Sequence, residues 1–256
     1  MTAEPESSDL GALPTRRRAG RRGGRHRGGS FTLPPGSPAV VLAGASSEVL
    51  AGLADIIQAA HSGVPVRSAG DDLTDLTGSP TAVVVPVLTG PNPALEDPLR
   101  EGLRDLPVLV TEPLGPHPLL AEALHLRLAE VGLARADRIR MMSMVTAADG
   151  IVLGVHTIDE SSEITAVLLA SRLAIPVVAA RLDEPEALAS AVAALRSSGA
   201  VRPALSPCVI DVNPDVLATA VAAAGVEYSA PLGAHPSLAQ LAVLRYVEAL
   251  EAAYLD

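Results

Sequence analysis

The sequence contains no lysine and no tryptophan, and it has few aromatic side chains of any kind. Its 256 residues include three Tyr, one Phe and one Cys, and all 19 basic residues are Arg. Without Lys the chain cannot form a Walker A loop, in which a Lys reaches the phosphates. The scarcity of rings argues against base-stacking platforms for nucleic acid. The single Cys208 excludes a disulfide framework and any zinc or iron–sulfur site built from several cysteines.

Long hydrophobic runs are also missing from the sequence. No run reaches the roughly 18 residues that a membrane-spanning helix needs, and the N-terminus lacks the apolar segment of a signal peptide. We therefore expect a cytoplasmic protein that is not embedded in a membrane. The hydrophobic fraction of 48% is ample for a core, which Ala, Val and Leu must build in place of rings.

Charge is divided unevenly along the chain, whose formal net charge is −10. Residues 1–30 hold seven Arg and three acids, whereas the remaining residues hold 12 Arg and 26 acids. Because the segment TRRRAGRRGGRHRGG has almost no apolar side chains to bury, we expect residues 1–32 to form a disordered Arg/Gly-rich tail. Such a tail could contact nucleic acid or an acidic partner. The acidic remainder has no nucleic-acid-binding motif, so a nucleic-acid partner is not expected.

Short Val-rich runs alternate with segments of helical periodicity after this tail. The runs are four to eight residues long and almost continuously apolar, which is typical of buried parallel strands. The segments between them have apolar residues three and four positions apart. This alternation predicts the α/β class, with parallel sheets flanked by helices. The predicted strands are Ala39–Ala43, Thr81–Leu88, Pro107–Thr111, Gly150–Val155 and Pro176–Ala180, and the predicted helices are Glu48–Ala60, Leu119–Val131, Ser161–Leu173, Pro185–Arg196 and Leu238–Tyr254.

One pattern occurs twice in the chain. Pro113–Ala121 reads PLGPHPLLA and Pro231–Ala239 reads PLGAHPSLA, so seven of nine residues are identical at an offset of 118. Further matches follow at offsets of 111 and 121. A period this long predicts two similar units in tandem rather than a solenoid, and we place them at 33–145 and 146–256. Because parallel sheets bind ligands at the carboxyl ends of their strands, a cleft between the two units is the expected site.

This layout resembles the sirohydrochlorin chelatase family, the class II tetrapyrrole chelatases. The resemblance rests on the paired α/β units and on the P-L-G-x-H-P element of each, and it covers about Pro38–Tyr254. It implies an ATP-independent lyase of siroheme or cobalamin biosynthesis. Such an enzyme inserts Co²⁺ or Fe²⁺, its metal substrate, into the carboxylate-rich macrocycle sirohydrochlorin. The resemblance implies no resident cofactor.

The family's two metal-binding histidines are both missing from this sequence. The family motif A-H-G-S-R-D-P aligns with AGASSEV, in which Gly44 stands at the histidine position while Ser46 and Glu48 match the serine and the acid. The second family histidine follows the third strand, where this chain has Pro93 or Ala94. Neutral imidazole can bind Co²⁺ or Fe²⁺ and can accept the pyrrole protons that the metal displaces. Glycine and alanine can do neither.

Three other histidines are candidates for the site. His156 follows the first strand of the second unit and could bind the metal or accept a proton as a substitute, although an exposed loop histidine without function is the alternative. His117 and His235 each precede a Pro and are predicted at helix N-caps. Alternatively, these helix N-termini bind carboxylates of the macrocycle. The candidate substrate-binding residues are therefore Ser46, Glu48, His117 and His235.

Two functions of different classes follow from the sequence. The first is a chelatase-like enzyme that inserts Co²⁺ or Fe²⁺ into sirohydrochlorin. The second is a non-catalytic chelatase homologue that binds a tetrapyrrole or a metal, or assists a true chelatase. The two-unit architecture favours the first function, and the missing histidines favour the second, because a fold does not by itself determine activity. The oligomeric state does not follow from the sequence.

Overall fold

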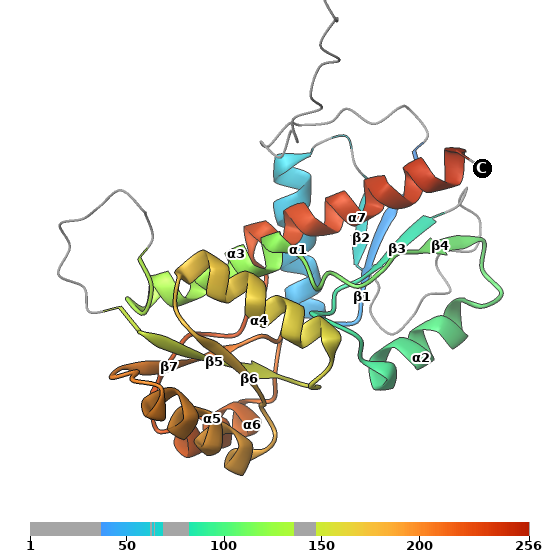
Figure 1. Cartoon of the computed structure of the whole chain (residues 1–256). Coiled ribbons are helices and arrows are strands. Elements are labelled where there is room, and N and C mark those ends of the chain that lie inside the picture. Colours follow the sequence, from blue (N-terminus) through green and yellow to red (C-terminus); the bar gives the residue numbers. More distant parts are fainter. Residues whose placement is uncertain (1–36, 62, 64, 69–81, 136–146, 256) are drawn as a thin grey trace, which may run out of the picture. The chain divides into compact units, whose positions relative to one another are not determined.

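The computed structural model describes residues 37–61, 63, 65–68, 82–135 and 147–255. The predicted tail at 1–32 and the predicted unit boundaries at 33 and 145–146 lie outside these residues. The described residues form two four-stranded parallel sheets with helices on their faces, which confirms the predicted α/β class (Figure 1).

The N-terminal sheet has the strand order β2-β1-β3-β4, and all its neighbouring strands are parallel. Every residue of β1 and β3 is buried, which explains why both strands read as continuous apolar runs. The elements of this unit are β1 (Val40–Ala43), α1 (Ser47–Ala60), β2 (Val66–Ser68), β3 (Ala82–Pro86), α2 (Pro93–Leu103), β4 (Val108–Val110) and α3 (Pro118–Glu130).

The C-terminal sheet repeats this topology in the order β6-β5-β7-β8. Ala43 pairs with Pro86 at the ends of β1 and β3, and Gly154 pairs with Pro207 at the ends of β5 and β7, as the offsets of 111 and 121 predict. The elements of this unit are β5 (Gly150–Val155), α4 (Glu160–Leu173), β6 (Val177–Arg181), α5 (Pro185–Ser197), β7 (Pro203–Pro207), α6 (Pro214–Ala224), β8 (Glu227–Tyr228) and α7 (Pro236–Leu255).

The two units exchange the helices that close them. Helix α3 ends the N-terminal unit but packs on α4 and β7, whereas α7 ends the C-terminal unit but packs on α1 and β3 (Figure 1). As a result, one apolar cluster contains residues of both sheets, with Leu42 and Leu153 among its fully buried members. Smaller clusters on the opposite sheet faces are covered by α2 in the N-terminal unit and by α5 and α6 in the C-terminal unit.

Two arginines at corresponding repeat positions form hydrogen bonds between each exchanged helix and the other unit. Arg127 of α3 donates from Nε and Nη2 to the Leu232 carbonyl at 3.1 and 2.6 Å. Arg245 of α7 donates from Nε to the Pro113 carbonyl at 3.1 Å. Each Arg also forms an ion pair with the Glu three residues further along its helix. Each exchanged helix is therefore bonded to the P-L-G element of the other unit.

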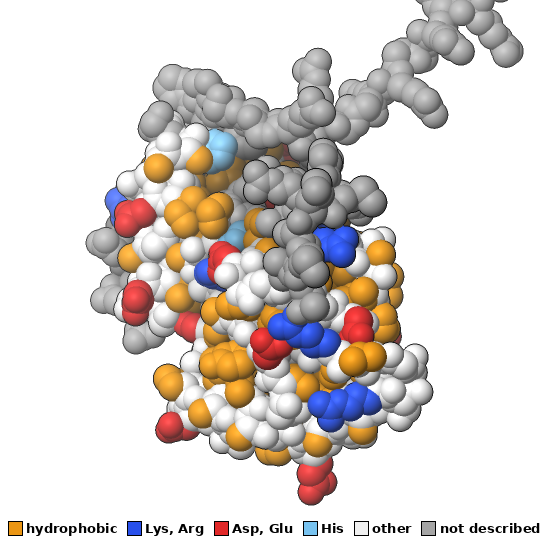
Figure 2. Space-filling view, turned by 90° about the vertical axis from the view of Figure 1, so that its left-hand side faces the viewer, with side chains coloured by type: hydrophobic (Ala, Val, Ile, Leu, Met, Phe, Trp, Pro, Cys, Tyr) orange, Lys and Arg blue, Asp and Glu red, His pale blue; other side chains and the backbone are white. Residues whose placement is uncertain are grey.

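The surface carries charges of both signs. Figure 2 shows acidic and basic side chains scattered among apolar ones on the face that it presents. Arginines often lie beside acids, as in the pairs of Arg181 with Asp183 at 2.7 Å and of Arg202 with Glu227 at 2.6 Å. Within the described part of the chain, no helix is both long enough and apolar enough to cross a membrane.

Candidate functional site

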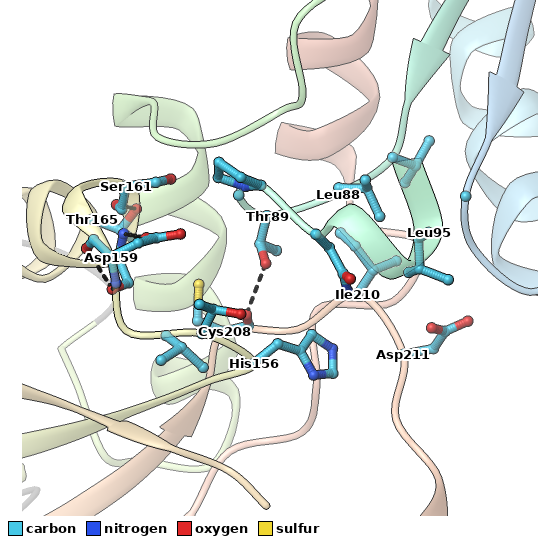
Figure 3. A pocket seen from close by; sticks show the side chains of 18 residues that line it. Leu88, Thr89, Leu95, His156, Asp159, Ser161, Thr165, Cys208, Ile210 and Asp211 are labelled. Atoms are coloured by element: carbon cyan, nitrogen blue, oxygen red, sulfur yellow. Dashed lines mark hydrogen bonds between the residues drawn. The ribbon is translucent and has the colours of Figure 1, made fainter. Parts of the chain in front are cut away.

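A pocket lies where the carboxyl ends of β1, β3, β5 and β7 meet (Figure 3). Its lining follows those strands in turn, with Gly44 after β1, residues 87–92 after β3, Val155 and His156 at the end of β5, and Cys208 after β7. This is where doubly wound sheets bind ligands. The pocket has a volume of about 50 Å³, which holds a few waters or one small chemical group, whereas whole-ligand pockets are several times larger.

Two hydrogen bonds join the two units beside this pocket. The Thr89 hydroxyl donates to the Cys208 carbonyl at 3.0 Å, and the Ser46 N–H donates to Asp211 Oδ2 at 2.8 Å. Because Ser46 immediately precedes α1, the Asp211 carboxylate accepts from a helix N-terminus, where negative charge is stabilised. The loops that follow β1 and β3 are thus bonded to the loop that follows β7.

Helix α4 begins at the pocket with a capping box. Asp159 Oδ1 accepts from the Ser162 N–H at 2.8 Å, and the Asp159 N–H donates to Ser162 Oγ at 3.0 Å. Between them lies Ser161, which is 8% exposed, lines the pocket and has a buried hydroxyl that no described residue hydrogen-bonds. The nearby Thr165 hydroxyl donates to the Ser161 carbonyl at 2.9 Å.

The acids of the pocket are already bonded to the backbone. Asp159 caps α4 through Oδ1 and Asp211 accepts from Ser46 through Oδ2, so the backbone engages one oxygen of each carboxylate. Among the residues that the structure describes, no group of three or more His, Cys, Asp or Glu side chains is arranged to hold a metal ion. Burial raises the pKa of Cys208 to about 12, so its thiol stays protonated at neutral pH. Cys208 is therefore a small buried residue of the core.

The two positions without the expected histidines differ in the structure. Gly44 lines the pocket with φ of +94°, and a Cβ added there would lie 3.4 Å from Leu88 Cδ2. Because L side chains rarely adopt this backbone conformation, a histidine at position 44 would be strained. Ala94 is exposed in the first turn of α2 and is not part of the lining, although its neighbour Leu95 is.

His156 lies in the pocket lining but is exposed to solvent. Figure 3 shows its imidazole directed from the end of β5 toward the side of the pocket formed by Ile210 and Asp211. Ser46 and Glu48 are exposed at the start of α1 and lie outside the lining, although Ser46 bonds to Asp211. Of the predicted site residues, the structure therefore brings only Gly44 and His156 together in this pocket.

His117 and His235 are N-cap residues, as predicted. Nδ1 of His117 accepts from the Leu119 N–H, and Nδ1 of His235 accepts from the Ser237 N–H, both at 3.1 Å. Neither histidine lines the pocket. Burial, together with the positive charge of Arg127, lowers the pKa of His235, so its ring stays neutral and keeps the lone pair that caps α7.

Three pocket residues that sequence reasoning did not single out are Thr89, Ser161 and Asp211. The repeat offset of 121 relates the end of β3 to the end of β7, and Thr89 and Asp211 each follow one of these corresponding strands, although the offset itself maps Thr89 on Ile210. No sequence signal distinguishes Ser161 from an ordinary serine in the first turn of a helix.

Comparisons with known proteins bear on the fold. The sequence matches none of the protein-family models, and no curated protein matches it. DR2241 of Deinococcus radiodurans, a multi-domain protein with structural similarity to chelatases, superposes with a TM-score of 0.61 at 19% identity over 83% of this chain and 55% of that one. This chain thus spans little more than half the length of DR2241.

Two smaller structures match over nearly their whole length. SirB from Bacillus subtilis, solved with Fe³⁺, has a TM-score of 0.58 at 14% identity. The match covers 83% of this chain and 94% of the SirB chain. CbiX, the terminal enzyme of siroheme biosynthesis in denitrifying bacteria, has a TM-score of 0.53 at 16% identity. The match covers 82% of this chain and 97% of the CbiX chain. At these identities the likeness concerns the fold alone. The chain has a chelatase-like fold of two parallel-sheet α/β units.

Proposed function

We propose that the protein is a non-catalytic chelatase homologue that binds a tetrapyrrole at the strand-end pocket and does not insert a metal. The observation that carries this proposal is the backbone of Gly44, whose φ of +94° suits glycine at the position where the family resemblance implies a histidine. Ala94, at the second such position, offers no ligand either. The chelatase-like fold and the place of the pocket at the strand ends support ligand binding.

The size of the pocket defines how such a ligand would bind. About 50 Å³ admits one side arm of a tetrapyrrole, so the ring itself lies outside, over the mouth. Leu95 lines the pocket yet is 46% exposed, and it offers an apolar contact for the ring. Because covering exposed apolar surface is the main favourable contribution to such binding, Leu95 is expected to contribute to affinity.

A chelatase is the second candidate function, and the position of His156 favours it. His156 lies at the carboxyl end of β5 and lines the pocket, where a neutral imidazole could bind Co²⁺ or Fe²⁺ as substrate and accept a pyrrole proton. Both functions bring the macrocycle to the same mouth. They differ in whether the macrocycle leaves with a metal.

Absorption spectroscopy with sirohydrochlorin tests both functions. Binding without turnover predicts a saturable spectral shift on adding the macrocycle, and no metal insertion above the buffer rate when Co²⁺ follows. Insertion above that rate which falls on His156→Ala would establish the second function and overturn the first. A spectrum that sirohydrochlorin leaves unchanged at all concentrations would overturn tetrapyrrole binding.

A matched pair of variants tests the place of the ring. Leu95 is 46% exposed at the pocket, and Val131 is 50% exposed at the end of α3, outside the lining. Leu95→Ala should weaken sirohydrochlorin binding about fivefold, since burying half of such a side chain is worth about 1 kcal/mol. Val131→Ala should leave the affinity unchanged. Equal effects of the two changes would contradict binding at this mouth.

A further inference from the structure

The hydroxyl of Ser161 is a buried polar group without a hydrogen-bond partner among the described residues. Ser161 is 8% exposed, and its Oγ is buried without a hydrogen bond in the described structure. A buried hydroxyl in this state costs free energy that a hydrogen bond would recover. Natural proteins keep few such groups, and one that lines a pocket indicates a missing partner.

The position of Ser161 indicates what that partner is. Ser161 is the second residue of α4, a helix of 14 residues, and the first N–H groups of a helix have no acceptor within it. Figure 3 shows its side chain directed from the start of α4 toward the loop that carries Thr89. Hydroxyl and N–H donors at a helix N-terminus suit a negatively charged oxygen.

The loop after β3 packs closely against the Ser161 side chain. A Cβ added at Gly90 would lie only 2.9 Å from Ser161 Oγ, which is shorter than an ordinary contact. No left-handed φ requires a glycine at position 90, in contrast to Gly44. A side chain at position 90 would therefore displace the Ser161 hydroxyl, whereas glycine leaves it in place at the pocket.

We infer that Ser161 Oγ and the N-terminus of α4 form a subsite for one carboxylate arm of the bound ligand. That the arm belongs to a tetrapyrrole rests on the proposed function. The carboxylate subsite itself does not, because a free short-chain carboxylate has the same chemistry. The arm enters the space of about 50 Å³ beside Gly90, and its carboxylate accepts from the Ser161 hydroxyl. The Asp159 carboxylate at the cap of α4 opposes the arm by like-charge repulsion.

Two substitutions with matched controls test the subsite through the sirohydrochlorin affinity. Ser161→Ala removes a hydrogen bond to a charged group and should weaken binding about 10- to 100-fold. Gly90→Ala should weaken binding at least as much, because its methyl group would lie 2.9 Å from Ser161 Oγ and displace the hydroxyl. The controls are Ser171→Ala, an exposed serine of the same helix, and Gly102→Ala, where an added Cβ meets nothing within 4 Å. Both controls should bind like the unaltered protein.

A third substitution tests the sign of the charge that the subsite holds. Asp159→Asn keeps a side-chain oxygen that can cap α4 and removes the negative charge. If the subsite holds a carboxylate, this variant should bind sirohydrochlorin several-fold more tightly. Weaker binding would mean that the group is a cation, and it would overturn the inference.

Protein stability distinguishes a binding role of Ser161 from a structural one. Because the hydroxyl has no partner in the described structure, Ser161→Ala should unfold at the same denaturant concentration as the unaltered protein or at a higher one. A clear loss of stability would show that Ser161 supports the fold, and it would overturn the inference.

Sodium propionate separates a failure of the inference from a failure of the proposed function. In amide NMR spectra, propionate should shift the Ser161 signal saturably in the unaltered protein and not in the Gly90→Ala variant. If propionate gives this result while sirohydrochlorin does not bind, the subsite stands and the tetrapyrrole proposal fails. If sirohydrochlorin binds equally well to all variants, the subsite is wrong and the proposed function stands. If no probe shifts Ser161, a water is its only partner and the inference is overturned.

Discussion

Alanine at Gly115 should destabilise the protein far more than alanine at Gly233, although the two glycines occupy the same position of the repeated P-L-G element. At Gly115 an added Cβ would lie 1.9 Å from the Thr89 carbonyl oxygen. That oxygen would have to withdraw by about 1.5 Å to reach an ordinary contact distance. At Gly233 the nearest atom is Arg127 Nη2 at 3.5 Å, which is an ordinary contact.

The contacts around each glycine set the expected magnitudes. Moving the segments of Thr89 and Gly115 apart strains the bonds that the Leu114 and Gly115 N–H groups donate to the Leu88 carbonyl, at 3.0 and 3.3 Å. Overpacking of about 1–3 kcal/mol and two weakened bonds of about 1 kcal/mol each give a loss of about 3–5 kcal/mol. Gly233 has φ of +56°, so alanine there costs only the left-handed backbone, about 1–2 kcal/mol.

Urea denaturation followed by far-UV circular dichroism measures both changes. The free energy of unfolding should fall by about 2 kcal/mol more for Gly115→Ala than for Gly233→Ala, with similar slopes against urea concentration. Equal losses, or a larger loss for Gly233→Ala, would refute the reasoning. Such a result would mean that the repeated glycines serve one shared backbone requirement rather than two different ones.

Three further changes probe the exchange of helices, the pocket and the caps. Arg127→Met removes both bonds to the Leu232 carbonyl and should lower the unfolding free energy by about 1–3 kcal/mol, measured in urea. Gly44→Ala should lower it by about 1–2 kcal/mol, because φ is +94° there; an unchanged value would contradict the described backbone. The pKa of His235 is lowered in the folded state, so the neutral ring contributes fully to the free energy of unfolding above pH 6.5. This contribution is lost as the pH falls through the folded pKa. His235→Asn, which keeps a capping oxygen, should therefore lose less stability between pH 7.5 and 5 than the unaltered protein does; identical pH curves would contradict this.

Much of the fold could be predicted from the sequence, because the central strands are buried on both faces. The strand predicted at Gly150–Val155 agrees with β5 residue for residue, and other predicted elements end within two residues of the observed ones. The strands that were missed have no apolar run to detect. β2 and β8 are short edge strands with mostly exposed side chains, and β7 reads PALSP, with two prolines and a serine.

The exchange of α3 and α7 could not be predicted from the repeat. Identical P-L-G-x-H-P elements predict that each unit closes with a helix, but either sheet can accept that helix. The bonds of Arg127 and Arg245 to the opposite units depend on which packing the chain adopts. Both arginines also form ion pairs at the surface, with Glu130 and Glu248, which the helical spacing of three residues allows in any packing.

The candidate site could be predicted in place but not in detail. Strand ends of parallel sheets are binding sites whatever the sequence, so Gly44 and His156 were expected at the site and do line the pocket. The importance of Ser161 depends on which hydrogen bonds the fold leaves unmade, and that follows only from coordinates. The same holds for Asp211, whose bond to Ser46 joins residues 165 positions apart.

Gel filtration of the protein with sirohydrochlorin and Co²⁺ tests the central claim most directly. The spectrum of the macrocycle that elutes with the protein reports both binding and metal content. Binding without insertion predicts that the macrocycle co-elutes with the protein in its metal-free form. The amount of cobalt complex should be no greater than in a buffer control without protein. Cobalt complex formed faster than in buffer would contradict the account, and so would protein that elutes without any macrocycle.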